Sequence, residues 1–201
     1  MPLIETPWPI LCLVAVLAYL LGSVPFGIVI TRALGLGDLR AIGSGNIGAT
    51  NVLRTGHKGA AAATLILDAA KGAVAVLLAR WLVGQDAAQL AGLAAFLGHV
   101  FPVWLRFKGG KGVATFIGTL VALYWPVGLG VCAVWLAVAL VFRISSLAAL
   151  MAAASAMIWM MVLGQGRMMV LGAVLTVLVY LRHSANITRL RAGTEPKLRL
   201  R

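Results

Sequence analysis

Apolar residues along this chain occur in long runs, separated by short segments rich in glycine, polar and positively charged residues. Several runs approach or exceed the roughly 18 residues that mark a membrane-spanning candidate. Because a chain in lipid must satisfy its backbone hydrogen bonds internally, the pattern predicts an all-α integral membrane bundle. The runs cover about Ile10–Ile30, Gly59–Val83, Ala87–Leu105, Val113–Phe142, Ile144–Leu163 and Met168–Leu181.

The fourth run is too long for one crossing. A single helix over Val113–Phe142 would be about 45 Å long, against a hydrocarbon core of about 30 Å. The run also contains Trp125-Pro126, an interfacial type of aromatic residue followed by a helix breaker. We therefore expect two helices here and seven transmembrane helices in all. The first of the two, after Lys111, should be short, with about 13 residues, so the preceding loop should dip below the membrane surface.

Positive charge supports this count and sets the orientation. The 201 residues contain 17 Lys and Arg against 5 Asp and Glu, a formal net charge of +12. With seven helices and the N-terminus outside, Arg80 and Arg167 lie outside and Lys71 lies within a helix. The other positive residues, the tail with Arg199 and Arg201 included, then face the cytoplasm, whereas one crossing fewer would divide them equally. The positive-inside rule thus predicts an outer N-terminus and a cytoplasmic C-terminus.

Composition narrows the class of protein. With 62% hydrophobic and 11% charged residues, the chain is not a soluble globule, and too little water-facing chain remains for a nucleic-acid-binding domain. Cys12 and Cys132 fall inside apolar runs, which argues against a disulfide framework or a metal cluster. The first nine residues lack the positive region of a secretory signal, so we expect the first run to be a retained helix. We see no linker or repeat and expect one transmembrane domain over residues 1–201.

A glycine-rich segment at residues 42–54 is the first candidate for chemistry. It reads Ile-Gly-Ser-Gly-Asn-Ile-Gly-Ala-Thr-Asn-Val-Leu-Arg. Glycines spaced by small polar residues allow backbone N–H groups to line an anion-binding concavity, with Ser44, Asn46, Thr50 and Asn51 as side-chain donors. A helix starting near Thr50 would add its positive end, and Arg54 would add a full charge. An ordinary glycine-rich connector is the alternative.

A second segment, residues 106–115, places Lys108 and Lys111 in a glycine-rich turn before a helix. It lacks the spacing of a nucleotide-binding P-loop and follows a membrane helix rather than a strand. Charge and N–H donors together can still hold a phosphate there. Both lysines could instead serve only as topology determinants, and for the nearby His99 we expect at most a structural role.

A third element is divided between Arg143–Leu147 and Arg182–Leu190. His183 and Asn186 are three residues apart, so on a continuing helix they would share a face where it leaves the membrane. Asp68 and Lys71, with the same spacing, are expected to pair inside the second apolar run, because an unpaired charge in lipid is costly.

Several kinds of catalysis are excluded by the residues present. The chain has no His-x-x-x-x-Asp and no Gly-x-Ser-x-Gly, and its five acids are too scattered along the sequence to suggest a metal site. The remaining picture is a cationic, donor-rich, metal-free pocket that faces the cytoplasm and suits two phosphate-bearing ligands.

At these residues the chain resembles the bacterial acyl-phosphate:glycerol-3-phosphate acyltransferases, the PlsY family of membrane enzymes. The resemblance extends over nearly the whole chain and includes three signatures in order. They are Gly43-Ser44-Gly45-Asn46-x-Gly48-Ala49-Thr50-Asn51, Phe107-Lys108-Gly109-Gly110-Lys111-Gly112-Val113-Ala114-Thr115 and Arg182-His183-x-x-Asn186-Ile187-x-Arg189-Leu190.

The resemblance implies transfer of a fatty acyl group from acyl phosphate to the 1-hydroxyl of sn-glycerol 3-phosphate in the bacterial inner membrane, at the cytoplasmic face. It implies no cofactor, metal or obligatory protein partner, and a monomer is expected. Carried over by position, Ser44, Gly45, Asn46, Ile47, Gly48, Ala49, Thr50 and Asn51 would bind acyl phosphate. Glycerol 3-phosphate would be bound by Arg54, Lys111, Ser146, His183 and Asn186. Ser44, Lys111 and His183 would be catalytic, and Lys108, Arg143, Asp68 and Lys71 would support the site.

Two other classes of protein compete with this interpretation. A transporter or channel for small organic phosphates could use the same cationic loops as a gate, although we find no inverted repeat. A purely structural membrane protein would leave the clustered Ser, Asn, Thr, Lys and His without a cause. For the enzyme, the proton of the attacking hydroxyl could go to His183 or to a substrate phosphate, and the phosphate is favoured.

Overall fold

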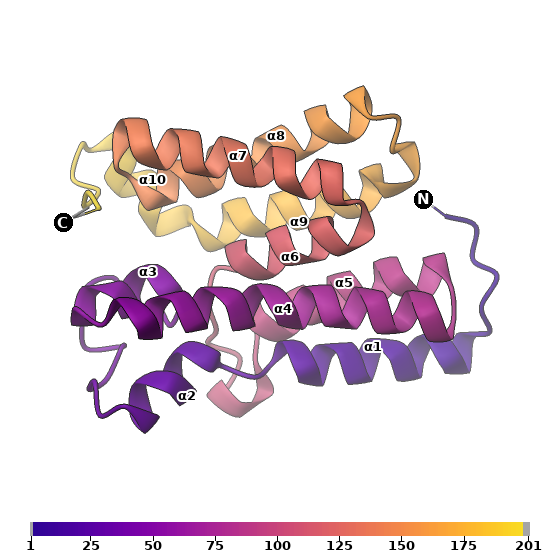
Figure 1. Ribbon diagram of the computed structural model, residues 1–201, viewed down its shortest axis with the longest axis horizontal. Coiled ribbons are helices and arrows are strands. Elements are labelled where there is room, and N and C mark those ends of the chain that lie inside the picture. Colours follow the sequence, from indigo (N-terminus) through magenta and orange to yellow (C-terminus); the bar gives the residue numbers. More distant parts are fainter. Residues whose placement is uncertain (1, 199–201) are drawn as a thin grey trace. The chain divides into compact units, whose positions relative to one another are not determined.

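The protein is all-helical over residues 2–198, the part of the chain that the computed structural model describes (Figure 1). Arg199 and Arg201, which entered the charge balance, lie outside the described residues. Long apolar sequences form these helices because hydrogen bonds within a helix satisfy the backbone locally. The expected all-α fold class is confirmed.

The described residues form two compact units, one over Leu3–Leu123 and the other over residues 124–198 together with Pro2. The N-terminal unit contains α1 (Trp8–Gly22), α2 (Phe26–Ala33), α3 (Ala49–Val52), η1 (Leu53–Thr55), α4 (Lys58–Leu82), α5 (Gln85–Val100), η2 (Val103–Leu105) and α6 (Val113–Leu123). The C-terminal unit contains α7 (Trp125–Phe142), α8 (Ser145–Val162), η3 (Gly166–Met168), α9 (Met169–Arg182) and α10 (Ser184–Arg191). A single domain over residues 1–201 stays a prediction.

Among the described residues, five helical segments are long and apolar enough to cross a membrane, or six if a bent pair counts as one span. The five are Trp8–Ala33, Lys58–Leu82, Gln85–Leu105, Trp125–Phe142 and Ser145–Val162, and the bent pair is α9 with α10. The shorter helix α6 is also apolar. Several membrane-spanning helices are therefore present, whereas seven crossings and the orientation of the termini stay predictions.

The long fourth run consists of two helices, as expected from its length. Helix α6 has 11 residues and ends at Leu123, and Tyr124 is extended, with φ −156° and ψ 101°, before α7 begins at Trp125. The guanidinium of Arg80 caps the end of α6, donating from Nη1 to the Ala122 carbonyl and from Nη2 to the Leu123 carbonyl, both at 2.8 Å. Carbonyls at a helix end lack intrahelical partners, so this cap allows a short helix to end beside α4.

The first apolar run is broken, although we expected one helix over Ile10–Ile30. Helix α1 ends at Gly22 and α2 begins at Phe26, because Pro25 has no N–H to donate and restricts the residue before it. The carbonyl of Val24 in this break accepts a hydrogen bond of 3.0 Å from Lys71 Nζ. A buried side chain thus satisfies a backbone group that the break leaves without a helical partner.

The last apolar helix also does not continue as expected. Helices α9 and α10 meet at His183 with a bend of 62°, so the continuing helix predicted to carry His183 and Asn186 on one face is wrong. The apolar sequence of α9 ends at Leu181, and α10 carries Arg189 and Arg191. The polar sequence of α10 does not favour continuing along the axis of the apolar α9, but hydropathy alone does not predict the angle of the bend.

Small residues allow close packing within the N-terminal unit. Helix α1 packs along α5, and α4 packs against both α5 and α6 (Figure 1). A Cβ added at Gly22 would overlap the carbonyl of Ala95, and one at Gly118 would overlap that of Ala69. Association of helices in lipid depends on such close approach, because lipid tails are as apolar as the side chains. In the C-terminal unit, α8 packs against both α7 and α9.

Candidate active site

The glycine-rich loop of residues 43–51 folds around the buried side chain of Asn51. Its Nδ2 donates to the carbonyls of Leu39 at 2.8 Å and Ile42 at 3.2 Å, and its Oδ1 accepts from Ser44 N at 3.3 Å. Because both N–H bonds of the amide point into the loop, Asn51 organises the loop rather than offering a donor to a ligand. Ser44 is exposed at the loop surface.

Gly43 provides the close approach and the turn that this loop needs. Its φ is +54°, in the left-handed region, and a Cβ added there would overlap Arg54 Nη1 and Asn51 Oδ1. The exposed Arg54 therefore lies against the loop, with Nη1 donating to Asn51 Oδ1 at 3.2 Å. The left-handed turn at Gly43 and the guanidinium of Arg54 thus lie together at this loop.

Two details of the first loop differ from expectation. Helix α3 begins at Ala49, close to the predicted start, but it has four residues before the 3-10 turn η1. So short a helix has only a small dipole, and the positive charge at this loop comes from Arg54. Asn46 does not point its side chain away from the backbone, since its Oδ1 accepts from Ile47 N at 3.0 Å.

The second loop, residues 106–112, uses most of its own N–H groups internally. The N–H of Phe107 donates to the Pro102 carbonyl at 3.0 Å and that of Lys108 to the Leu105 carbonyl at 3.1 Å. The N–H groups of Gly109 and Gly110 likewise donate to the carbonyls of Val100 and His99, both at 3.1 Å. These four amides are therefore not arranged around an anion, contrary to expectation. The loop still carries positive charge, including that of the half-buried Lys111.

Arg40 joins the two loops of the N-terminal unit. Its Nη2 donates to the carbonyl of Lys108 at 2.6 Å, across 68 residues of sequence. Sequence reasoning missed Arg40, because no local pattern indicates which distant carbonyl an exposed arginine will contact. Lys108 itself is exposed, and its backbone supports the loop through this bond.

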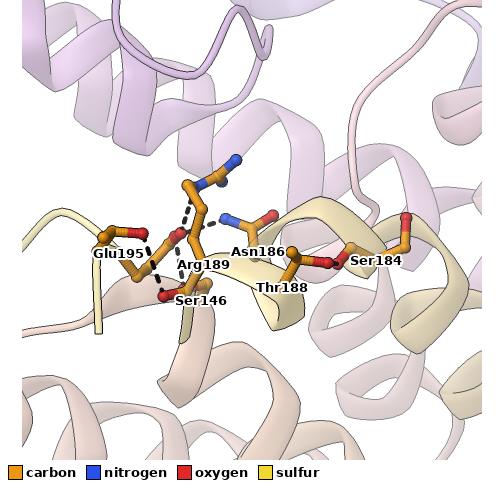
Figure 2. A network of polar contacts seen from close by, with 7 residues as sticks. Ser146, Ser184, Asn186, Thr188, Arg189 and Glu195 are labelled. Carbon is orange, nitrogen blue, oxygen red and sulfur yellow. Dashed lines mark hydrogen bonds and ion pairs between the residues drawn. The ribbon is translucent and has the colours of Figure 1, made fainter. Parts of the chain in front are cut away.

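In the C-terminal unit, Ser146 and Asn186 meet at the carboxylate of Glu195 (Figure 2). Glu195 Oε1 accepts from Ser146 Oγ at 2.8 Å and from Asn186 Nδ2 at 2.5 Å, and Oε2 accepts from Arg189 Nε at 2.7 Å. The side chain of Glu195 is 7% exposed. Two residues expected at the glycerol 3-phosphate site are thus brought together by an acid to which the sequence assigned no role.

The C-terminal segment is held at a second point near this cluster. The N–H of Leu198 donates to the carbonyl of Arg143 at 2.6 Å. Arg143 ends α7 with φ +57°, and its N–H donates to the Ala139 carbonyl at 3.0 Å. Its backbone thus supports the start of α8, where Ser146 lies. His183 is buried at the end of α9, with Nδ1 2.8 Å from the Val179 carbonyl.

Opposing effects set the pKa of Glu195. Burial raises the pKa of this carboxyl. Hydrogen bonds from Asn186, Ser146 and Arg189, together with the positive charge of Arg189, lower this pKa by more than burial raises it. The net pKa lies below its usual value. Glu195 is therefore ionised and acts as an acceptor of hydrogen bonds around which the cluster is organised.

Replacing Glu195 by glutamine is expected to destabilise the protein by about 1–2 kcal/mol, because the amide places a donor opposite Arg189 and removes the charge. A lowered pKa in the folded state stabilises the protein fully above the unfolded pKa of about 4.3. That contribution is lost as pH falls through the folded value. Thermal unfolding midpoints of the two proteins should therefore differ above about pH 5 and converge in more acidic solution. Equal midpoints at every pH would contradict this, and Glu5→Gln, at an exposed acid, serves as control.

A signal for Glu195 exists in the sequence, since it is a single acid within a strongly basic tail. Such an isolated opposite charge favours a specific pair, although the sequence does not indicate Ser146 or Asn186 as partners. Among the described residues no group of three His, Cys, Asp or Glu side chains could hold a metal ion. The Asp68–Lys71 pair expected in α4 is confirmed, with Lys71 Nζ 2.9 Å from Asp68 Oδ1.

Fold and site together define a class of protein: a polytopic helical membrane protein with cationic, hydrogen-bonding loops suited to phosphate groups. A family model described as Glycerol-3-phosphate acyltransferase matches residues 12–193. The chain is 67% identical over 198 residues to a glycerol-3-phosphate acyltransferase of Cereibacter sphaeroides (strain ATCC 17025 / ATH 2.4.3), with 98% of this chain and 94% of the relative covered. It is 64% identical over 198 residues to that of Ruegeria pomeroyi, with 98% of each chain covered.

Solved structures agree with these relatives. A crystal structure of PlsY (YgiH), an integral membrane glycerol 3-phosphate acyltransferase, in its glycerol 3-phosphate form has a TM-score of 0.89 and 40% sequence identity, and covers 94% of this chain and 96% of that one. The lysophosphatidic acid form has a TM-score of 0.87 and 39% identity, with 93% and 94% covered. The chain belongs to the glycerol-3-phosphate acyltransferase family of integral membrane enzymes, and the resemblance to PlsY is confirmed.

Proposed function

We propose that this enzyme transfers a fatty acyl group from acyl phosphate to the 1-hydroxyl of sn-glycerol 3-phosphate, giving lysophosphatidic acid and inorganic phosphate. Similarity to a glycerol-3-phosphate acyltransferase over 98% of the chain is the observation that carries the proposal. The acceptor and product agree with the two forms in which the similar PlsY structure was solved. An acyl phosphate donor suits a chain whose loops gather cations and hydroxyl groups.

The site residues are assigned from the loops described above. The Ser44–Asn51 loop binds the phosphate of acyl phosphate, with the Ser44 hydroxyl and backbone N–H groups as donors and Asn51 holding the loop in place. Glycerol 3-phosphate is bound by five residues, of which Lys111 contributes a charge to its phosphate. The others are Arg54, Ser146, His183 and Asn186.

Positioning and electrostatics account for the chemistry. Acyl phosphate is an activated mixed anhydride, so the glycerol hydroxyl attacks its carbonyl carbon without a covalent enzyme intermediate. The carbon–oxygen bond to phosphate then breaks, and fixed cations stabilise the negative charge that develops. A substrate phosphate accepts the hydroxyl proton, because Glu195 has a lowered pKa and its oxygens already accept three hydrogen bonds.

The membrane arrangement completes the proposal. Seven crossings arise if the five long spans, the bent pair and the short α6 each cross once. The N-terminus then lies outside, which the positive-inside rule favours, and the site faces the cytoplasm of a bacterial inner membrane. The acyl chain lies among the helices, and the product leaves sideways into lipid. The enzyme acts as a monomer.

Donor selectivity tests this function. Purified protein should form lysophosphatidic acid and release one phosphate for each product from palmitoyl phosphate and glycerol 3-phosphate. Palmitoyl-coenzyme A and palmitoyl-acyl carrier protein should not support the reaction. Product formed from a thioester but not from the acyl phosphate would overturn the donor assignment. Uptake of glycerol 3-phosphate into liposomes without any product would favour the transporter.

A further inference from the structure

Three ionisable side chains of the N-terminal unit form a buried cluster that the reaction above does not use. Asp68 Oδ1 lies 2.9 Å from Lys71 Nζ and 3.6 Å from His99 Nδ1. The side chains of Asp68, Lys71 and His99 are 4%, 1% and 5% exposed. Within the described residues, no donor reaches Asp68 Oδ1 with hydrogen-bond geometry, so Lys71 forms an ion pair with it and the imidazole of His99 lies close to it. Ionisable groups in a membrane-spanning helix are costly and generally serve a function.

Contacts with α6 and with the break between α1 and α2 help to hold Asp68 in place. Lys71, on the same helix, also donates to the Val24 carbonyl in the break between α1 and α2. The hydroxyl of Thr115, in the first turn of α6, donates to the backbone carbonyl of Asp68 at 2.8 Å. Lys71 balances the charge of Asp68 without any further group, so charge neutralisation does not explain His99.

The opposite edge of the His99 ring faces the second loop. A Cβ added at Gly110 would overlap His99 Nε2, so the loop backbone lies directly on the imidazole. The N–H of Gly110 also donates to the His99 carbonyl at 3.1 Å. Because Gly110 immediately precedes Lys111, the ring lies between the Asp68 carboxylate in α4 and the backbone next to Lys111.

We infer that Asp68 and His99 are positioning residues for Lys111. Asp68 fixes the orientation of the imidazole through Nδ1, and the Nε2 edge supports the backbone at Gly110 and so places the lysine ammonium. This inference rests on the proposed binding of glycerol 3-phosphate by Lys111. Because the acyl phosphate is assigned to the other loop, the pair acts mainly on the affinity for the acceptor.

Three substitutions in the full-length protein test the two contacts of the ring separately. His99→Asn retains a nitrogen near the position of Nδ1, whereas His99→Gln retains one near that of Nε2. Asp68→Asn removes the charge that holds the ring. Each should raise the KM for glycerol 3-phosphate about tenfold and leave kcat and the KM for palmitoyl phosphate within about threefold of wild type. The reason is that a misplaced binding group weakens the binding of only the substrate that it contacts. The matched control, Asp86→Asn, alters a carboxylate at the first turn of α5 and should leave all three constants within about twofold.

The outcomes separate this inference from the proposed function. If the wild type is active and the variants have an unchanged KM for glycerol 3-phosphate, the positioning role alone is overturned. The same holds if the variants lose activity equally toward both substrates and in proportion to the loss of folded protein. Wild type without turnover on palmitoyl phosphate would overturn the donor assignment. Positioning is then measured by the thermal shift that glycerol 3-phosphate produces, which should be smaller in the three variants than in Asp86→Asn. Equal shifts would overturn the inference.

Discussion

Replacing Lys111 by methionine is expected to lower kcat/KM for glycerol 3-phosphate at least about a hundredfold, equivalent to about 3 kcal/mol. The N–H groups of residues 107–110 already donate to backbone carbonyls, so the loop has few other donors for an anion. In the proposed site the lysine charge therefore supplies most of the interaction of this loop with phosphate. Methionine preserves the length of the side chain, so the expected loss reflects the charge.

Lys108→Met is the matched control for this experiment. Lys108 lies in the same loop and carries the same charge, but its side chain is exposed, and its contribution to the structure comes from its backbone. Its loss should not exceed about threefold, because an exposed charge is screened by solvent. Equal losses in the two variants would show that the loop acts only through its net charge, and an active Lys111→Met enzyme would remove Lys111 from the site.

Gly43→Ala is expected to reduce turnover at least about a hundredfold while the protein still folds and inserts. The added methyl group would overlap Arg54 Nη1 and Asn51 Oδ1, so it would displace the arginine and the amide around which the loop folds. Left-handed backbone in alanine costs a further roughly 1–2 kcal/mol. Kinetics with both substrates, together with the thermal midpoint, would separate the loss of the site from the loss of the fold.

Gly37→Ala provides the matched control for Gly43→Ala. Gly37 also has a positive φ, +84°, but nothing lies within 4 Å of a Cβ added there. The substitution therefore introduces a similar backbone strain without displacing a neighbour. It should lower the midpoint slightly and leave turnover within about threefold. If Gly37→Ala impaired turnover as much as Gly43→Ala, the contact with Arg54 would not be the cause.

Hydropathy and charge predict most of the helices of this protein. The division of Val113–Phe142 near Trp125-Pro126 follows from bilayer thickness, and the Asp68–Lys71 pair follows from helical spacing and the cost of charge in lipid. Both features depend on local sequence and on the properties of lipid as a solvent, so a single sequence is enough to predict them. The break at Pro25 has a local cause as well, but a run of apolar residues conceals it.

The partners of Glu195 and Arg40, which sequence reasoning missed, lie on distant segments of the chain. Glu195 contacts Ser146 across 49 residues, and Arg40 contacts the Lys108 carbonyl across 68. No periodicity or motif encodes such partners. The second loop was expected to offer its N–H groups to a phosphate, but four of them bind carbonyls that the folded η2 turn and the end of α5 bring close.

Sidedness of the three loop segments tests the central claim most directly. Single cysteines at Ala41, Lys108 and Ser184, with Cys12 and Cys132 replaced by alanine, would be labelled with a membrane-impermeant maleimide in intact cells and in inverted vesicles. Gly166→Cys, between α8 and α9, provides the opposite face. We predict that the first three are labelled from the cytoplasmic side alone and Gly166→Cys from the outside alone. Labelling of any of the three loop positions from the outside would contradict a single cytoplasmic site for both phosphorylated substrates.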